Sequence, residues 1–248
     1  MKIKNVLISQ PQPADPEKSP YFDLAKKHHL KIDYHKFIKI EGISARDFRK
    51  DKVYIQEHSA IIFTSRNAVD HFFRVAEEMR VEVPDTMKYF CVSESVAFYL
   101  QKYVQYRKRK IFHGQQCFAD LIDVIKKHKN EQFLLPCSDI HKEEIPALLE
   151  KNNIAYNKAI LYRTVASDLS HLDLDTYDLL VFFSPSGVAS LLMNFPDFRQ
   201  GDTQIAAFGP TTAKAVADAG LTLNINAPTK TAPSMSMAID EFLKTNKK

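Results

Sequence analysis

The chain has 248 residues, of which 45% are hydrophobic and 26% are charged, a composition typical of a globular protein with room for two domains of ordinary size. No apolar run approaches the roughly 20 residues of a membrane-spanning helix, and the short apolar stretch near the start lacks a small-residue cleavage site, so we expect a cytoplasmic protein without membrane contact. The net charge of +4 is too small to predict nucleic acid as the partner.

The cysteines, histidines and glycines argue against several classes of chemistry. Cys91, Cys117 and Cys137 are odd in number and have no paired spacing, which argues against a disulfide framework or a zinc site and favours a reducing cytoplasm. No HExxH motif is present, and the pair His28-His29 is more simply the polar end of a helix. The six glycines form neither GxGxxG nor GxxxxGK, so dinucleotide and P-loop chemistry are unsupported, and we expect no bound metal.

The first part of the chain alternates predicted strands and helices. After a strand over 6–9, Ser19 and Pro20 begin a helix that runs to about residue 29, because serine caps a helix and proline suits its first position. The elements that follow are a strand over 31–34, an exposed extended segment over 36–41, a short helix within 44–51, a strand to 64, a helix over 67–79, a strand to 92, a helix to about 103, a strand near 111, a helix over 117–128, a strand to 135 and a helix over 143–151. Such alternation predicts a mainly parallel sheet with helices on both faces.

A second extended segment determines the predicted domain organisation. Residues 157–165, NKAILYRTV, alternate apolar and polar side chains and are predicted to pair with residues 36–41. The chain then leaves the first domain, builds the second over 41–158 and returns. The predicted fold is α/β, with two doubly wound parallel-sheet domains of similar topology. Domain 1 is discontinuous, over 1–36 plus 166–248, domain 2 covers 41–158, and the two linker strands join them.

The most informative motif is an apolar strand that runs into a helix through a serine. Residues 179–192, LLVFFSPSGVASLL, align without a gap on residues 60–73, AIIFTSRNAVDHFF, with Ser184 on Ser65 at an offset of 184 − 65 = 119. Each serine is a natural N-cap, and Pro185 occupies a position where its missing N–H costs nothing. Two similar halves are therefore predicted.

Two further pairs of segments repeat this design. Residues 204–215, QIAAFGPTTAKA, align on residues 88–99, KYFCVSESVAFY, with Gly209 on Ser93 at an offset of 209 − 93 = 116. The third and weaker pair consists of apolar strands that break into proline and polar residues, 5–12 and 132–139. A single elbow of this kind is an ordinary βα turn, but helices that start at the carboxyl ends of parallel strands also bind anions, and the duplication favours that interpretation.

The basic run 107–110 and the last predicted helix bear on the structure more than on the function. The basic run 107–110 is flanked by Tyr103, Tyr106 and Phe112, an interleaving that also occurs in nucleic-acid-binding patches. We favour the simpler interpretation that these cations keep an edge strand from pairing with another chain. The last predicted helix closes domain 1 with apolar residues at helical spacing, Met235, Ile239 and Phe242.

The motifs FTSRNAV, LYRTV, FFSPSGV and AAFGPTTAKAVADAGL, the last followed by APTKTAPSM, resemble those of the uroporphyrinogen-III synthase family over nearly the full length. The resemblance implies two α/β domains with the active site in the cleft between them. It also implies a cofactor-free lyase of tetrapyrrole and heme biosynthesis, which cyclises hydroxymethylbilane to uroporphyrinogen III with loss of its terminal hydroxyl and inversion of ring D. A cytoplasmic monomer in transient contact with the upstream deaminase would suit that role.

The resemblance also indicates site residues. The substrate carries an acetate and a propionate on every pyrrole, and capped helix N-termini can bind carboxylates without a dense cluster of Arg and Lys. By resemblance the linker residue Tyr162 is the general acid that protonates the departing hydroxyl, although a tyrosine on an alternating strand is otherwise simply a good strand residue. The candidate substrate-binding residues supply hydroxyls and neighbouring N–H groups: Ser65, Ser93, Ser95, Ser184, Ser186, Gly187, Thr211 and Thr212.

The chain departs from the family pattern at several positions. Gln10 stands where an Arg is expected after the first strand, and Gln204 stands where a basic residue often precedes AAxG. Aligning VSESVA on FGPTTA places Val96 on the second Thr, so a hydroxyl is missing there unless Ser93 or Ser95 substitutes. The basic residues that could replace the missing ones are Arg66, Arg163, His141, Lys142 and Lys214.

Two other functions remain open at this point. A non-enzymatic two-lobed binding protein for an anionic small molecule has the same architecture, and a secretion signal or a fused DNA-binding helix pair would favour it, but neither is visible. A two-domain glycosyltransferase would need a nucleotide-phosphate loop, which the scarcity of glycine discourages.

Overall fold

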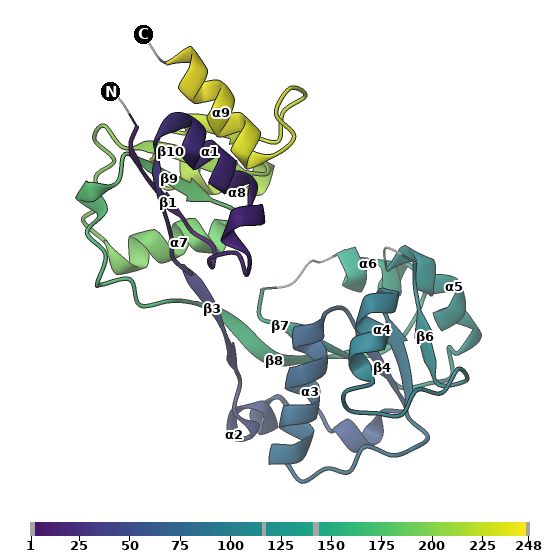
Figure 1. Cartoon of the computed structure of the whole chain (residues 1–248). Helices are drawn as coiled ribbons and strands as arrows, with labels where there is room; N and C mark the ends of the chain where they lie inside the picture. Colours follow the sequence, from purple (N-terminus) through teal and green to yellow (C-terminus); the bar gives the residue numbers. More distant parts are fainter. Residues whose placement is uncertain (1–2, 116–117, 141–143, 247–248) are drawn as a thin grey trace. The chain divides into compact units, whose positions relative to one another are not determined.

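The computed structural model describes residues 3–115, 118–140 and 144–246, and the chain divides into two compact units. Unit 1 comprises Met1–Lys39 and Val165–Lys248, and unit 2 comprises Ile40–Thr164. Each unit has a sheet of mainly parallel strands with helices packed on both faces (Figure 1), which confirms the predicted fold class. No helix in the described part of the chain is long and apolar enough to cross a membrane.

Unit 1 has a five-stranded sheet in the order β11-β10-β9-β1-β2. Its neighbouring strands are parallel throughout. The strands are β1 (Asn5–Ile8), β2 (Lys31–Tyr34), β9 (Leu179–Phe182), β10 (Gln204–Phe208) and β11 (Ile225–Ala227). The helices are α1 (Pro20–His28), α7 (Pro185–Asn194), α8 (Pro210–Asp218) and α9 (Met235–Thr245).

Alternate residues of the unit 1 strands face opposite layers of helices. Ile8 packs in a cluster with Leu24 of α1 and Ile239 of α9, whereas its neighbour Leu7 packs in a cluster with Leu191 of α7. All four residues of β9 are buried, as expected of a parallel strand that is covered on both faces. The hydrophobic runs in the sequence therefore mark the central strands.

Unit 2 has a six-stranded sheet in the order β3-β8-β7-β4-β5-β6. The strands are β3 (Ile38–Gly42), β4 (Ala60–Phe63), β5 (Lys88–Cys91), β6 (Ile111–His113), β7 (Phe133–Ser138) and β8 (Tyr156–Ala166). The helices are α2 (Ala45–Phe48), α3 (Arg66–Glu78), α4 (Glu94–Leu100), α5 (Ala119–Lys127) and α6 (Glu144–Lys151).

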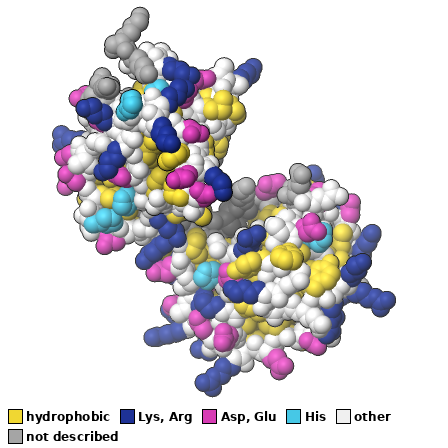
Figure 2. All heavy atoms as spheres, viewed as in Figure 1, with side chains coloured by type: hydrophobic (Ala, Val, Ile, Leu, Met, Phe, Trp, Pro, Cys, Tyr) yellow, Lys and Arg dark blue, Asp and Glu magenta, His cyan; other side chains and the backbone are white. Residues whose placement is uncertain are grey.

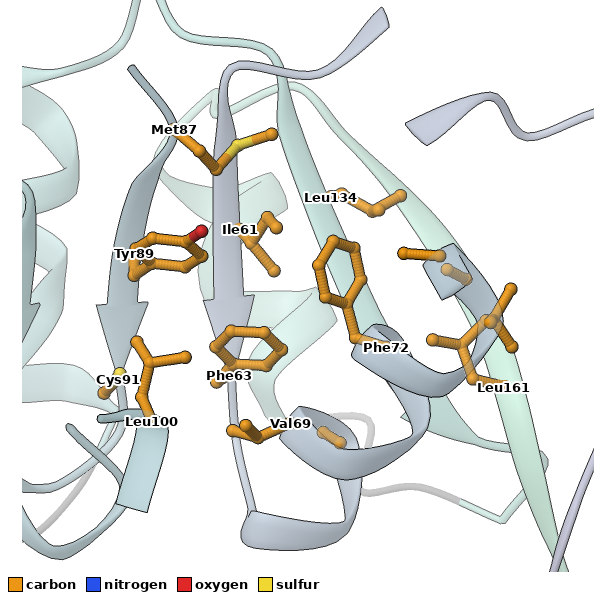
Figure 3. Close-up of a cluster of buried hydrophobic side chains, with 14 of the residues drawn as sticks. Ile61, Phe63, Val69, Phe72, Met87, Tyr89, Cys91, Leu100, Leu134 and Leu161 are labelled. Atoms are coloured by element: carbon orange, nitrogen blue, oxygen red, sulfur yellow. The ribbon is translucent and has the colours of Figure 1, made fainter. Parts of the chain in front are cut away.

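The core between this sheet and helix α3 is rich in aromatic rings. Figure 3 shows Phe63 of β4, Phe72 of α3 and Tyr89 of β5 directed into the same space. The ring of Phe63 lies edge-on to Phe72, with centroids 5.6 Å apart, and parallel to Tyr89, with centroids 6.0 Å apart. Helices α5 and α6 cover the opposite face through a second cluster that includes Leu121 and Leu149.

The three pairs of similar segments in the sequence occupy corresponding positions in the two sheets. The order β10-β9-β1 in unit 1 matches the order β5-β4-β7 in unit 2. Strands β9 and β4 belong to the strongest sequence pair, and β1 and β7 belong to the weakest. The internal similarity is therefore structural as well as sequential.

The predicted linker strands and the basic run 107–110 lie towards opposite edges of the unit 2 sheet. The segments interpreted as linker strands lie in β3 and β8, which are neighbours in this sheet, and β8 also pairs in parallel with β7. Strand β6 lies at the opposite edge, next to the basic run 107–110. Within that run Arg107 lies 3.7 Å from the Asp85 carboxylate, and Lys110 donates to the Asp85 carbonyl. This position agrees with protection of an edge strand.

Candidate functional site

Two of the predicted cap residues begin their helices as expected. The hydroxyl oxygen of Ser65 accepts a hydrogen bond from the Ala68 amide at 3.1 Å, and that of Ser184 accepts one from the Gly187 amide at 3.2 Å. A serine hydroxyl that accepts in this way still has its proton to donate. Both serines are partly exposed, so each helix start presents a hydroxyl donor beside its positive end.

The second pair of helix starts differs from the first. Gly209 begins α8 with φ of 87°, a left-handed conformation that favours glycine, and Pro210 follows it. Thr211 is exposed, but only 1% of Thr212 is accessible, so a ligand would reach its hydroxyl only after surrounding side chains move. Direct contact of Thr212 with substrate remains a prediction.

The corresponding helix in unit 2, α4, has a weaker cap. Ser93 precedes the helix but makes no side-chain capping bond, and its hydroxyl lies 3.0 Å from the Ser95 hydroxyl. Glu94 is exposed in the first turn, where its carboxylate interacts favourably with the helix dipole and repels another anion. The two serine hydroxyls are adjacent, but the charge beside them opposes a carboxylate ligand.

At the carboxyl ends of the unit 1 strands, the predicted residues at the start of α7 lie close to Ser9, a serine that the motifs do not indicate. Phe182 of β9 is in register with Ala207 of β10, so the residues after both strands lie at the same edge. Ser9 follows β1 there, and its amide donates to the Val181 carbonyl at 3.0 Å. A Cβ atom on Gly187 would lie 3.6 Å from the Ser184 hydroxyl oxygen and 3.7 Å from that of Ser9. Two hydroxyls thus flank the first turn of α7, with the half-buried Ser186 in the same turn.

Tyr162 lies in β8 next to a β-bulge. Cys137 of β7 is opposite Ile160, but the next residue, Ser138, is opposite Tyr162, so Leu161 is the extra residue. As a result, the consecutive side chains of Leu161 and Tyr162, at 0% and 6% exposure, both belong to the buried cluster on the α3 side of the sheet. A regular strand would have directed one of them to the opposite face.

The bulge brings the phenol of Tyr162 to the start of α3. Its oxygen lies 3.3 Å from the hydroxyl oxygen of Ser65, and its ring stacks on that of His71, with centroids 4.9 Å apart and planes 19° apart. Burial raises the pKa of the Tyr162 phenol above its usual value, and the hydrogen bond with Ser65 opposes part of that rise. The phenol is therefore protonated at neutral pH and can act as a proton donor.

Asp139 holds the backbone on the other side of Tyr162, although no motif indicates this residue. Its amide donates to the Tyr162 carbonyl at 3.1 Å, and its carboxylate accepts from the Thr164 amide at 3.1 Å and the Ile140 amide at 2.8 Å. Desolvation acts to raise the pKa of Asp139, but the bonds from Ser138 and these two amides outweigh it and lower the pKa. The only signal in the sequence is a Ser-Asp pair where a buried strand ends.

The basic residues considered as replacements lie on both units. Arg66 is exposed at the first position of α3, with its guanidinium 5.4 Å from the ring centre of Tyr99. Arg163 is exposed directly after Tyr162, and Lys214 is exposed on α8. On the faces seen in Figure 2, basic and acidic side chains are interspersed on each unit.

Two of the predicted replacements and one cysteine lie outside the described residues: His141, Lys142 and Cys117. Cys91 and Cys137 are buried. Within the described ranges, no group of three or more His, Cys, Asp or Glu side chains could hold a metal ion.

The two glutamines that stand at positions expected to be basic lie at opposite ends of the unit 1 strands. Gln10 is exposed beyond the carboxyl end of β1. Gln204 is the first residue of β10, and its side chain donates to the Asp202 carbonyl at 2.8 Å. Because the helices α7 and α8 begin at the carboxyl edge, Gln204 is remote from the serines there and Gln10 is beside them.

One family model and several solved structures match the chain. The model of the family described as uroporphyrinogen-III synthase HemD matches residues 37–236. Uroporphyrinogen-III synthetase from Helicobacter pylori has a similar structure, with 16% identity, coverage of 98% of this chain and 100% of that chain, and a TM-score of 0.59. A mutant uroporphyrinogen III synthase from the extremely thermophilic bacterium Thermus thermophilus has 13% identity, the same coverage and a TM-score of 0.52. At these identities the structures establish the fold. No curated protein sequence matches the chain.

Proposed function

The chain belongs to the uroporphyrinogen-III synthase family, and we propose that it cyclises hydroxymethylbilane to uroporphyrinogen III, with loss of water and inversion of ring D. The observation that carries the proposal is the extent of the family match, residues 37–236, which includes both serine-capped helix starts and Tyr162. A lyase of tetrapyrrole biosynthesis with this reaction needs no cofactor, because ring closure involves no net oxidation or reduction.

The groups at the carboxyl ends of the unit 1 strands are suited to bind the carboxylates of the substrate. Ser9 and Ser184 offer hydroxyls on either side of Gly187, and the first turn of α7 adds backbone N–H groups and the positive end of the helix dipole. A hydrogen bond to a charged group contributes about 1.5 to 3 kcal/mol. A few such contacts per carboxylate are enough to hold the ligand without a cluster of arginines.

Tyr162 is the proposed general acid. Its phenol donates a proton to the terminal hydroxyl of hydroxymethylbilane, the C–O bond breaks and water leaves, and the products are the Tyr162 phenolate and a cationic azafulvenium, the protonated form of an azafulvene. The electron-deficient carbon is then attacked by the substituted carbon of ring D, which forms a spiro intermediate on the way to the inverted ring. The hydroxyl of Ser65, 3.3 Å from the phenol oxygen, donates to the phenolate after the proton has left.

The test of the proposed function is an isomer assay. Hydroxymethylbilane is generated in situ with a deaminase, the expected transient partner, and the oxidised products are separated into uroporphyrins I and III by chromatography. Uncatalysed closure gives the type I isomer, so predominantly type III product supports the proposal. Only type I product, at the rate of a blank without the protein, would refute it and favour a binding protein for an anionic small molecule.

A further inference from the structure

The backbone that positions Tyr162 is held by a side chain from the neighbouring helix. Arg74 of α3 directs its guanidinium at the bulge in β8, and its Nη2 donates to the Leu161 carbonyl at 3.2 Å. The same nitrogen donates to the Ile43 carbonyl at 2.8 Å, directly after β3. The Ile43 amide also donates to the Leu161 carbonyl at 2.9 Å. Arg74 therefore ties the extra residue of the bulge to the end of the adjacent strand.

The same guanidinium also orients the ring that stacks on Tyr162. Its Nε donates to Nδ1 of His71 at 3.2 Å, which makes Nδ1 an acceptor and leaves the ring proton on Nε2. The His71 ring is thereby fixed against the phenol ring, 4.9 Å between centroids. Glu78 completes the arrangement, with its Oε1 2.5 Å from Nη1 of Arg74. A planar guanidinium can bond to all of these partners at once, whereas the single ammonium group of a lysine lacks the fork geometry.

A glycine makes room for this guanidinium. A Cβ atom on Gly42, the last residue of β3, would lie 2.8 Å from Nη2 and 2.9 Å from Cζ of Arg74. Such distances are shorter than real Cβ contacts, so any larger residue would force the guanidinium to shift. Gly42 thus gives a way to disturb the arrangement without removing Arg74.

We propose that Arg74 is a positioning residue for the reaction of Tyr162: it fixes the bulge at Leu161 and, through His71, holds the phenol beside Ser65. This inference rests on the proposed function. An acid has to be placed to within a fraction of an ångström of the atom that it protonates, and a displacement of about 1 Å can reduce the rate about 100-fold. Arg74 itself touches neither the phenol nor, in this proposal, the substrate.

The test compares Arg74→Lys, Arg74→Gln and Gly42→Ala in the isomer assay and in thermal unfolding. We expect kcat to fall about 10-fold or more for Arg74→Gln and less for Gly42→Ala, with KM within about twofold, because the acid is misplaced while carboxylate contacts persist. Arg74→Lys should restore little of the rate. The matched control is Lys88→Gln, which removes a 2.6 Å ion pair with Glu131 from the same unit and should leave kcat unchanged.

A measurement independent of turnover follows the His71 ring. Its nitrogen chemical shifts should report a neutral ring with the proton on Nε2 in the wild type and a mixture of tautomers in Arg74→Gln. Unchanged kcat in both Arg74 variants, at any loss of stability, would overturn the positioning role while type III product from the wild type leaves the proposed function intact. A wild type that gives only type I product would refute both.

Discussion

Replacing Tyr162 by Phe removes one oxygen from a buried ring and tests the central step of the proposed reaction. The ring packing is retained, since the stack on His71 depends on the ring alone. The hydroxyl of Ser65 loses the phenol at 3.3 Å but keeps the Ala68 amide at 3.1 Å, and it is partly exposed to water. We therefore expect the free energy of unfolding to fall by about 0.5 to 1 kcal/mol, the low end for one hydrogen bond.

The effect on turnover should be much larger than the effect on stability. General acid catalysis contributes about 10²- to 10⁴-fold, and the terminal hydroxyl of hydroxymethylbilane departs readily, so we expect kcat to fall about 10²-fold. KM should change little, because the proton is transferred only in the transition state. Burial raises the pKa of the phenol above its usual value, so the phenol stays protonated at neutral pH and its ionisation should not reduce wild-type activity there.

The matched control is Tyr89→Phe. Tyr89 lies in the same unit, is 5% exposed and stacks on Phe63, so its substitution removes the same oxygen from a comparably buried ring. The assay measures type III product against time for both variants, with urea unfolding in parallel. An unchanged kcat for Tyr162→Phe, or an equal loss for the control, would remove Tyr162 from the mechanism.

Three further predictions concern unit 1. Gly187→Ala should stabilise the protein by about 0.5 to 1 kcal/mol in urea unfolding, because alanine favours a helix and its new Cβ meets only atoms at 3.6 Å or more. Gly209→Ala should destabilise the protein in the same measurement, because φ of 87° strains an alanine. Ser184→Ala should raise KM about 10-fold with little change in kcat, and an unaffected KM would contradict its contact with a carboxylate. Hydrogen bonds from His28, Lys244 and Lys27 lower the pKa of Asp240, so its stabilising effect is present above about pH 4 and is lost as the pH falls further; Asp240→Asn should lower stability at pH 7 and flatten the acid limb of a pH–stability curve.

The parts of the fold that local rules determine could be predicted from the sequence. Ser19, Ser65 and Ser184 cap their helices because the capping bond involves residues only two or three positions away. The duplicated strands could be predicted because their hydrophobic runs record burial on both faces. The similarity of the two halves further predicts that corresponding strands occupy corresponding places in the two sheets, as they do.

The fine geometry of the site depends on packing that no local pattern records. Thr212 and Thr211 have the same side chain in one helix turn, yet only Thr211 is exposed, because the orientation of α8 on its sheet decides between them. The bulge at Leu161 interrupts an alternation that the sequence represents as regular. Arg74 and Asp139 act on that backbone from other elements, and their roles become visible only when β7, β8 and α3 are assembled.

The charges at the helix starts indicate how the two units divide the work. The first turns of α3, α7 and α8 carry no acidic residue, so their positive ends remain available to an anion, whereas α4 has Glu94 in its own first turn. Unit 1 therefore leaves the starts of α7 and α8 open to carboxylates, and unit 2 leaves the start of α3, at Ser65. That one is also where the phenol of Tyr162 lies. Under the proposed function, unit 1 offers the starts of α7 and α8 to the substrate carboxylates, whereas unit 2 combines the start of α3 with the proposed proton donor.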